Sequence, residues 1–427
     1  MSMRLIKDNR NFQIHWVSSL IAQMGNFFTV VAMPWLALSI SNNDPVSMAT
    51  VLAAASLPQA VFLLFGGLIV DRFSPFGVLF SSRIIFVLVV MSLAVLVYFN
   101  QVSLYLLHIY SFLLGTLTAL SIPAAQSMLP GMTHPDDLGH ANGYMMGSIQ
   151  VAQILGPLAA GWVIWMAKYY RGIPESHTDS VAIAIAFFID ALGVLIAVIL
   201  MSFIRLNTIL ANKDGIFHML KEGFVFCWRD KGVAVVLGYL FVLSFFLHGT
   251  LMAGLPVVAK LQLGLDERGY SVLYAMLGIG TVLGIVLGML IKLPSVKLGL
   301  LVICCDITGA WGLIFLSTAT SYMYAAVALV VIGIPNGFVM VSGTTWFQKR
   351  TPAHLMGRVI SILMFSILGL VPVSLVITGW LMTSYPATAV LQIAGLTILL
   401  LGLVSLSIPG MRRIGATPVV KYPFEVT

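Results

Sequence analysis

Two aspartates lie inside long apolar segments of this sequence, where a charge is costly to hold. Asp190 follows the apolar run 187–189, and Asp306 follows a pair of cysteines. A carboxyl group surrounded by hydrocarbon is a functional hypothesis by default, because only a proton or a polar partner makes its burial tolerable. Two roles stay open for both residues: carrying a coupling proton, or making a structural hydrogen bond to a neighbouring helix.

Other reactive side chains do not form a catalytic or metal-binding pattern. His248 can titrate near neutral pH, although a single helix histidine is more often a hydrogen-bonded packing residue. Cys227, Cys304 and Cys305 have neither metal-ligand spacing nor the spacing of a disulfide framework. No phosphate-binding glycine motif occurs in a suitable context. The sequence therefore disfavours an ATP-driven pump and a membrane-embedded enzyme, and we expect no cofactor and no metal.

Composition places these residues in a membrane. Of the 427 residues, 59% are hydrophobic and 9% are charged, whereas soluble domains carry about 25% charged residues. A lipid-facing backbone must satisfy its hydrogen bonds within helices or a closed barrel. The apolar runs are continuous and do not alternate as barrel strands would. The sequence predicts an all-α membrane protein.

The charged residues divide the chain into helix-sized intervals. Ignoring histidine, the charge-free intervals are 11–43, 45–70, 84–135, 138–167, 232–259, 269–291 and 359–411, and two more, 180–204 and 298–348, are interrupted only by Asp190 and Asp306. A spanning helix needs about 20 apolar residues. Six intervals therefore hold one helix each. The three longest hold two, with turn residues at 100–103, 318–321 and 383–386. The prediction is twelve transmembrane helices.

Lysine and arginine are distributed unevenly over the predicted loops. Lys168, Arg171, Lys260 and Arg268 fall on one side of the membrane, and all the other basic residues fall on the opposite side. The positive-inside rule then places both termini in the cytoplasm. This asymmetry explains the net charge of +7 without a nucleic-acid partner. The first apolar stretch is too long for the core of a cleavable signal, so we interpret it as the first helix.

The chain divides into two similar parts. We predict an N-terminal six-helix bundle at 1–205, a cytoplasmic linker at 206–232 and a C-terminal six-helix bundle with a short tail at 233–427. The linker carries either an amphipathic helix on the membrane surface or a plain tether. The loops that follow the fourth and tenth helices are similar. Two six-helix repeats are typical of transporters whose substrate site lies between the halves.

The segment from Gly67 to Arg72 resembles a signature of the major facilitator superfamily. That loop signature reads Gly-x-x-x-Asp-Arg-x-Gly-Arg-Arg, and this chain departs from it at 74–76, where Ser, Pro and Phe stand. Arg83 is a candidate to supply part of the missing charge. The resemblance extends over nearly the whole chain and implies two pseudo-symmetric halves of six helices each, the major facilitator fold.

The same resemblance implies a gate at the cytoplasmic ends of the helices. The acid of the signature is expected at the N-terminus of the eleventh helix, where a carboxylate is favourable, and this contact would break on inward opening. The candidate gate residues are Gly67, Asp71, Arg72, Arg83, Gly357 and Arg358. The alternative is that Asp71 only fixes the topology of the second helix.

Helix 5 carries a second motif, Gly156-Pro157 with Gly161. It resembles the fifth-helix motif of exporters in the superfamily, although ordinary close packing is an alternative. Together with the loops after helices 4 and 10, it is similar to the branch of bacterial enterobactin-exporter-like and macrolide-efflux-like proteins. That branch implies export of a bulky amphipathic compound across the bacterial inner membrane.

In this fold helices 1, 4, 7 and 10 line the cavity, whereas helices 6 and 9 are peripheral. The polar cavity candidates are therefore Gln23, Asn26, Gln126, Tyr239, His248 and Asn336. The peripheral helices carry Asp190 and Asp306, which argues against direct substrate contact. Related exporters often have an acid near Asn26, and an asparagine cannot take up a proton there.

The sequence as a whole predicts a proton-driven exporter that works by alternating access. We expect a monomer that moves drugs or siderophore-like metabolites, with protons as coupling ion and lipid as its surroundings. Import of a small metabolite or siderophore is the alternative. A receptor is disfavoured because there is no obvious soluble output domain, and a channel because no filter segment is recognisable.

Overall fold

A computed structural model describes residues 9–72, 74–134, 137–171, 175–204, 216–290, 298–352 and 355–412. Within these ranges all regular structure is helical. Twelve helical segments there are long and apolar enough to cross a membrane. The prediction of an all-α protein with twelve spanning helices is confirmed.

The first six spans are formed by α2 (Arg10–Ile40), α3 (Pro45–Arg72), α4 (Pro75–Tyr98), α5 (Leu104–Ser127) with the short η1 (Leu129–Gly131), α6 (Leu138–Arg171) and α7 (Glu175–Met201). The helix α8 (Ile216–Arg229) follows. The last six spans are formed by α9 (Lys231–Ser244) with η3 (Phe245–Gly249), α10 (Thr250–Val257) and η4 (Val258–Gln262), then α11 (Glu267–Leu290), α12 (Leu298–Ser317), α13 (Tyr322–Arg350), α14 (Met356–Leu368) with α15 (Val371–Ser384), and α16 (Ala387–Ser407). A final turn, α17, covers Pro409–Arg412.

The three predicted turns divide the long intervals as expected. The turn after α4 contains Asn100 with a φ of 55°, a conformation that asparagine tolerates better than most residues. The next helix starts at a serine cap, because Ser103 accepts from the Leu106 amide at 3.3 Å. Ser321 caps α13 in the same way, through the Tyr324 amide. Short polar turns with cap residues were therefore a reliable signal.

Two spans are irregular in a way that the apolar pattern did not show. The seventh span contains two π-helical segments, η3 and η4, and the eleventh is broken into α14 and α15 just before Pro372. Ser374 of α15 donates to the Phe245 carbonyl at 2.5 Å. Ser244 donates to the Ile367 carbonyl. The two irregular spans therefore satisfy each other's backbone groups inside the membrane.

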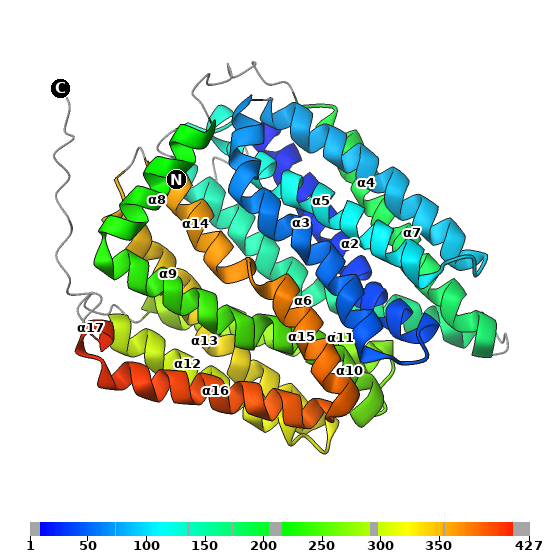
Figure 1. The fold of residues 1–427 in the computed structure, drawn as a ribbon. Coiled ribbons are helices and arrows are strands. Elements are labelled where there is room, and N and C mark those ends of the chain that lie inside the picture. Colours follow the sequence, from blue (N-terminus) through cyan, green and yellow to red (C-terminus); the bar gives the residue numbers. More distant parts are fainter. Residues whose placement is uncertain are drawn as a thin grey trace.

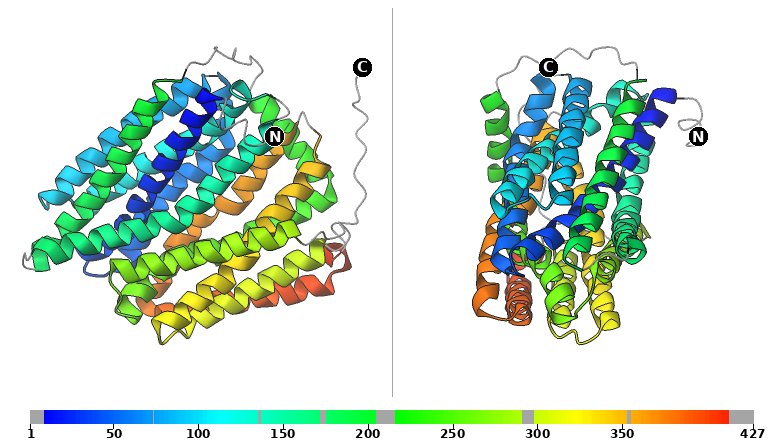
Figure 2. Two further views of the ribbon diagram at one scale, coloured as in Figure 1. Left: turned by 180° about the vertical axis from the view of Figure 1, so that it is seen from behind. Right: turned by 90° about the vertical axis from the view of Figure 1, so that its right-hand side faces the viewer.

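The two halves lie side by side and touch along two pairs of helices (Figures 1 and 2). α3 lies against α14 and α15, and α6 lies against α11. We call the end where α8 lies and α2 begins the linker face. The opposite end, with the turn at 41–44 between α2 and α3, is the far face. This arrangement confirms the predicted pair of six-helix halves.

Glycines set the closest helix contact in the second half. Gly284 of α11 lies directly against the Ile334 carbonyl, and Gly337 of α13 lies directly against the Thr281 carbonyl. Neither position has room for a Cβ. Gly280 and Gly333, four residues earlier on the same two helices, also face a backbone carbonyl of the other helix. Small residues at this spacing let two backbones approach, which is a main source of helix association in lipid.

We predict that Gly337→Val destabilises the protein by about 1–3 kcal/mol, because the new side chain overpacks a backbone contact. Gly238→Ala is the matched control, since no atom lies within 4 Å of a Cβ at that position. Thermal unfolding of the purified variants in detergent measures the difference. Equal melting temperatures for the two variants would contradict this packing.

Candidate functional site

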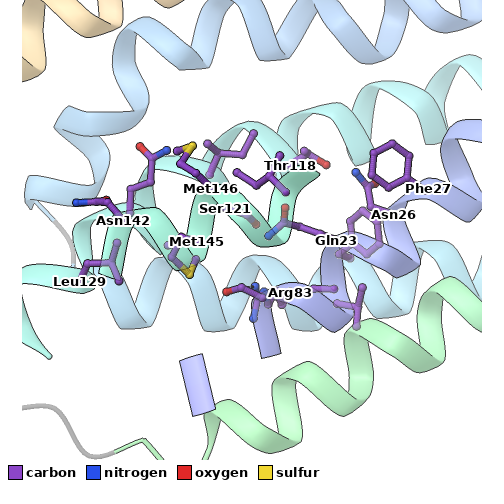
Figure 3. A pocket seen from close by; sticks show the side chains of 18 residues that line it. Gln23, Asn26, Phe27, Arg83, Thr118, Ser121, Leu129, Asn142, Met145 and Met146 are labelled. Carbon is purple, nitrogen blue, oxygen red and sulfur yellow. Dashed lines mark hydrogen bonds between the residues drawn. The ribbon is translucent and has the colours of Figure 1, made fainter. Parts of the chain in front are cut away.

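A cavity of about 350 Å³ lies within the first half. Its wall combines apolar side chains from α2, α4, α5 and α6 with a few polar groups (Figure 3). The polar lining residues are Ser19, Gln23, Asn26, Arg83, Thr118, Ser121, Gln126 and Asn142. A mainly apolar wall with a few directing polar groups is typical of sites for amphipathic ligands.

Three of the six cavity candidates line this cavity: Gln23, Asn26 and Gln126. The other three lie in the second half and are not part of its wall. Tyr239 is on α9, His248 lies in the π-helical η3, and Asn336 is exposed on α13. The structure therefore brings together the candidates on the first and fourth spans, α2 and α5. The candidates on the seventh and tenth spans lie outside this cavity wall.

One turn of α2 faces the cavity on one side and Asp190 on the other. The cavity side presents Asn26 and Phe27. On the α7 side, Thr29 donates to Asp190 Oδ2 at 2.5 Å. A Cβ on Gly25 would lie 2.8 Å from Asp190 Oδ1, so glycine is needed for this approach. Val194, one turn after Asp190 on α7, also lines the cavity, so Asp190 lies one helical turn from the cavity wall.

Asp190 is fully buried, and its second oxygen has no hydrogen-bond partner among the described residues. Asp306 on α12 is also buried, at 7% exposure. The Tyr239 hydroxyl of α9 lies beside Asp306. Both carboxyl groups therefore face a spanning helix of the cavity-lining set, α2 or α9.

Arg83 lies inside the first half, in the cavity wall. Because α4 already begins at Pro75, Arg83 is two turns inside the helix and is only 7% exposed. Its guanidinium donates to Met201 Sδ at 2.8 Å and to Ser19 Oγ at 3.4 Å. We associated this residue with the loop signature from the sequence. The structure instead places it within α4, where it lines the cavity.

The fifth-helix motif lies at two close contacts of α6. A Cβ on Gly156 would lie 2.7 Å from the ring of Phe27, and Gly161 lies directly against Ser271 of α11. Pro157 is buried within the same helix. Gly161 therefore marks a place where the two halves meet.

Charged and aromatic side chains join the halves near the far face. Lys168 of α6 pairs with Glu267 of α11 at 2.5 Å and with Asp179 of its own half at 2.7 Å. Arg268 lies 4.0 Å from the ring centre of Trp162, a cation–π contact between α11 and α6. These contacts hold the far ends of the two halves together.

Aromatic rings continue this contact inward from the far face. Trp35 of α2 lies 5.8 Å from Tyr270 of α11, and Lys260 stands over the same indole. One layer deeper, Phe27 meets the edge of Tyr274 at 6.2 Å. Because Phe27 also lines the cavity, these rings close the cavity toward the far face.

The predicted gate is only partly within the described structure. The surroundings of Gly67 and Gly357 are not described, and neither are the side chains of Asp71 and Arg72. Arg358 forms an ion pair with Glu222 of α8. The backbone of Gly223 also lies next to Arg358, so the linker helix packs directly on the first turn of α14.

Comparisons with known proteins agree with this architecture. The sequence profile of the Major Facilitator Superfamily matches residues 16–372. The Staphyloferrin A transporter of Staphylococcus aureus (strain NCTC 8325 / PS 47) is 26% identical over 176 residues, which is 41% of this chain. That alignment spans 42% of the relative.

Solved structures share the fold at low identity. A POT family transporter in complex with 5-aminolevulinic acid has a TM-score of 0.75 at 11% identity, with 95% of this chain and 97% of that chain covered. A D-xylose-proton symporter has a TM-score of 0.70 at 14% identity, with 96% and 98% covered. The match of the profile to most of the chain decides the family. This chain is a multi-pass membrane protein, and it belongs to the Major Facilitator Superfamily.

Proposed function

We propose that this protein is a proton-coupled exporter of small amphipathic compounds in a bacterial inner membrane, with both termini in the cytoplasm. It works by alternating access between the two faces of the membrane. The observation that carries this proposal is the combination of joined helix ends at the far face with a cavity that Phe27 closes on that side.

The described conformation is then the inward-facing one. With the linker face in the cytoplasm, the ion pair of Lys168 with Glu267 and the ring contacts of Trp35 form the outer gate. The cavity lining includes Leu129, just after the end of α5, and Asn142, near the start of α6, and both of these helix ends lie at the linker face. A cytoplasmic compound would therefore enter from this side.

The nature of the cargo is supported by the cavity wall. Phe27, Phe86, Met145 and Met146 supply apolar surface, and side-chain amides supply hydrogen bonds. Methionine adapts to ligands of different shape, which suits a site for bulky compounds. The partial similarity to a staphyloferrin A transporter supports siderophore-like metabolites beside drugs as candidates.

Asp190 is the proposed site of proton coupling. Its neutral form suits the buried environment, and its charged form would require a new partner or water. Because Asp190 contacts Thr29 and Gly25 of α2, loss of its proton acts on the helix that also carries Asn26 and Phe27. Asp306 has no such connection to the described cavity.

The proposal predicts that a disulfide between the halves stops transport. Gly278→Cys with Gln153→Cys places two thiols in contact across α11 and α6, because a Cβ on Gly278 would lie 3.4 Å from the Gln153 Cγ. The background is a chain in which the three native cysteines are replaced by alanine. Oxidation should abolish gradient-driven uptake of a fluorescent amphipathic compound into inverted vesicles, and reduction should restore it.

Each single cysteine variant is the control for this experiment and should transport under both conditions. Full transport by the oxidised double variant would contradict alternating access. A fixed proton gradient of either sign also reports direction. If the compound accumulates only under the proton gradient whose sign would drive an importer, the proposal of export is wrong and import is the function.

We predict that Glu267→Gln loosens the far face without unfolding the protein. Lys168 keeps Asp179 as its partner, so the variant loses only the charge pair between the halves. Hydrogen–deuterium exchange in the first two turns of α11 should become several-fold faster. Asp179→Asn is the matched control, because it removes the pair within one half, and it should leave this exchange unchanged. Faster exchange in Asp179→Asn than in Glu267→Gln would show that the pair of Lys168 with Glu267 is not the contact that closes the far face.

We predict that Asp190→Asn uncouples transport from protons. The amide keeps the shape of the side chain but cannot release a proton, so pH-driven accumulation should fall to the level without a gradient. Equilibration of the substrate down its own gradient should persist. Asp306→Asn is the control and should respond fully to the pH gradient. If both variants respond fully, neither acid is the coupling site.

A further inference from the structure

Arg83 is a buried cation without a buried counter-charge. It is 7% exposed and lines the cavity, yet no carboxylate of the described residues lies within 4 Å of it. Its direct contacts are a serine hydroxyl and a methionine sulfur. The charge of Arg83 acts on His15, which is fully buried as well. The guanidinium has five donors and stays protonated in proteins.

An unpaired charge in such a place is costly to fold. The penalty for a buried ion is offset only by an opposite charge with good hydrogen bonds. Ser19 Oγ, at 3.4 Å from Nη2, and a thioether sulfur provide little of either. The arrangement is therefore incomplete as a structural ion site and is open on the side of the cavity (Figure 3).

The fold itself does not require a cation at this level of the helix. Arg83 stands eight residues after the first residue of α4, Pro75, and Asp306 stands eight residues after the first residue of α12, Leu298. These are the third helices of the two halves. The second half thus has a buried acid, and not a buried cation, on its third helix.

We propose that Arg83 binds a carboxylate of the transported compound. This inference rests on the proposed function and narrows its cargo to anionic amphipathic molecules. A carboxylate fits the fork of a guanidinium with two parallel hydrogen bonds. The neutral amides of Gln23, Asn26 and Gln126 supply hydrogen bonds to the rest of the molecule. The apolar wall receives its body.

The charge balance of the cavity favours a carboxylate over a phosphate. Among the lining residues in the described part of the chain, Arg83 is the only cation and none is an acid. One carboxylate neutralises one guanidinium, whereas a phosphate dianion would leave a negative charge buried without a partner. The site therefore selects singly charged groups.

The test measures the preference of the cavity for anions and needs no knowledge of the cargo. Gln126→Cys is introduced into the full chain without its three native cysteines and reconstituted in liposomes. The rates of reaction with anionic sulfonatoethyl and cationic trimethylammonioethyl methanethiosulfonate are compared. A nearby unpaired arginine should favour the anionic reagent by about tenfold or more. Benzoate should slow this reaction more than benzamide does, and more than inorganic phosphate does.

The decisive variant keeps the arginine and neutralises it. Ser19→Asp places a carboxylate beside the guanidinium, so the rate ratio should fall about tenfold. Ser19→Asn has nearly the same shape without the charge and should keep the ratio. Arg83→Gln should behave like Ser19→Asp if it folds. A cysteine introduced in place of Asn336, outside the cavity wall, should not respond to any of these changes.

An unchanged ratio in Ser19→Asp, or equal protection by benzoate and benzamide, would overturn this assignment. Stronger protection by phosphate would overturn the choice of carboxylate. The labelling needs no transport, so its outcome is separate from that of the vesicle experiments. If the vesicles transport but the cysteine introduced in place of Gln126 shows no preference for the anionic reagent, only the role of Arg83 is refuted. An anion preference without any transport would refute only the proposed exporter.

Discussion

Hydrocarbon offers no partner to a polar group, and this constraint decides most of what is seen in this protein. It forces every spanning backbone into a helix. It also makes each buried charge or hydroxyl an exception that needs a reason. The irregular seventh and eleventh spans follow the rule, because Ser244 and Ser374 donate to carbonyls of the facing span. Arg83 and Asp190 are two of the described residues at which the rule is not fully satisfied.

The same constraint explains how the halves are held together. In lipid, apolar side chains gain little by meeting each other, so close backbone packing and polar pairs provide the specificity of contact. Within the second half, Gly284 and Gly337 provide the close packing. Between the halves, Gly161 and the pair of Lys168 with Glu267 provide both. The contact between the halves thus combines a close approach at Gly161 and an ion pair near the far face with the packing of α3 on α14 and α15.

The spans could be predicted from sequence because charge-free length and turn residues are local signals. Every predicted turn from 100–103 onward separates two helices in the structure. The π-helical η3 and the break before Pro372 could not be predicted, since each depends on hydroxyl groups of another span. The length of the charge-free segments gives the number of helices. It does not show which hydroxyl group of another span donates to a carbonyl at an irregular turn.

The candidate site divides in the same way. Gln23, Asn26 and Gln126 were expected from the resemblance, because the fold fixes which helices surround the cavity. Arg83 was associated with the loop signature because it could supply part of the charge that the signature lacks at 74–76. Whether it belongs to the loop or the helix depends on where α4 begins, and Pro75 at that position moves it inside. The start of α4, two turns before Arg83, therefore decides whether this residue belongs to the loop or to the cavity wall.

The two proposed sites are connected by one helix. α2 presents Asn26 and Phe27 to the cavity, Ser19 to Arg83, and Thr29 to Asp190. An anion that neutralises Arg83 and a proton that neutralises Asp190 would therefore both act on α2. Since Phe27 also meets Tyr274 of the other half, a shift of α2 reaches the contact that closes the far face. Coupling in this protein then needs no long pathway, because the cargo, the proton and the gate share the same spanning helix.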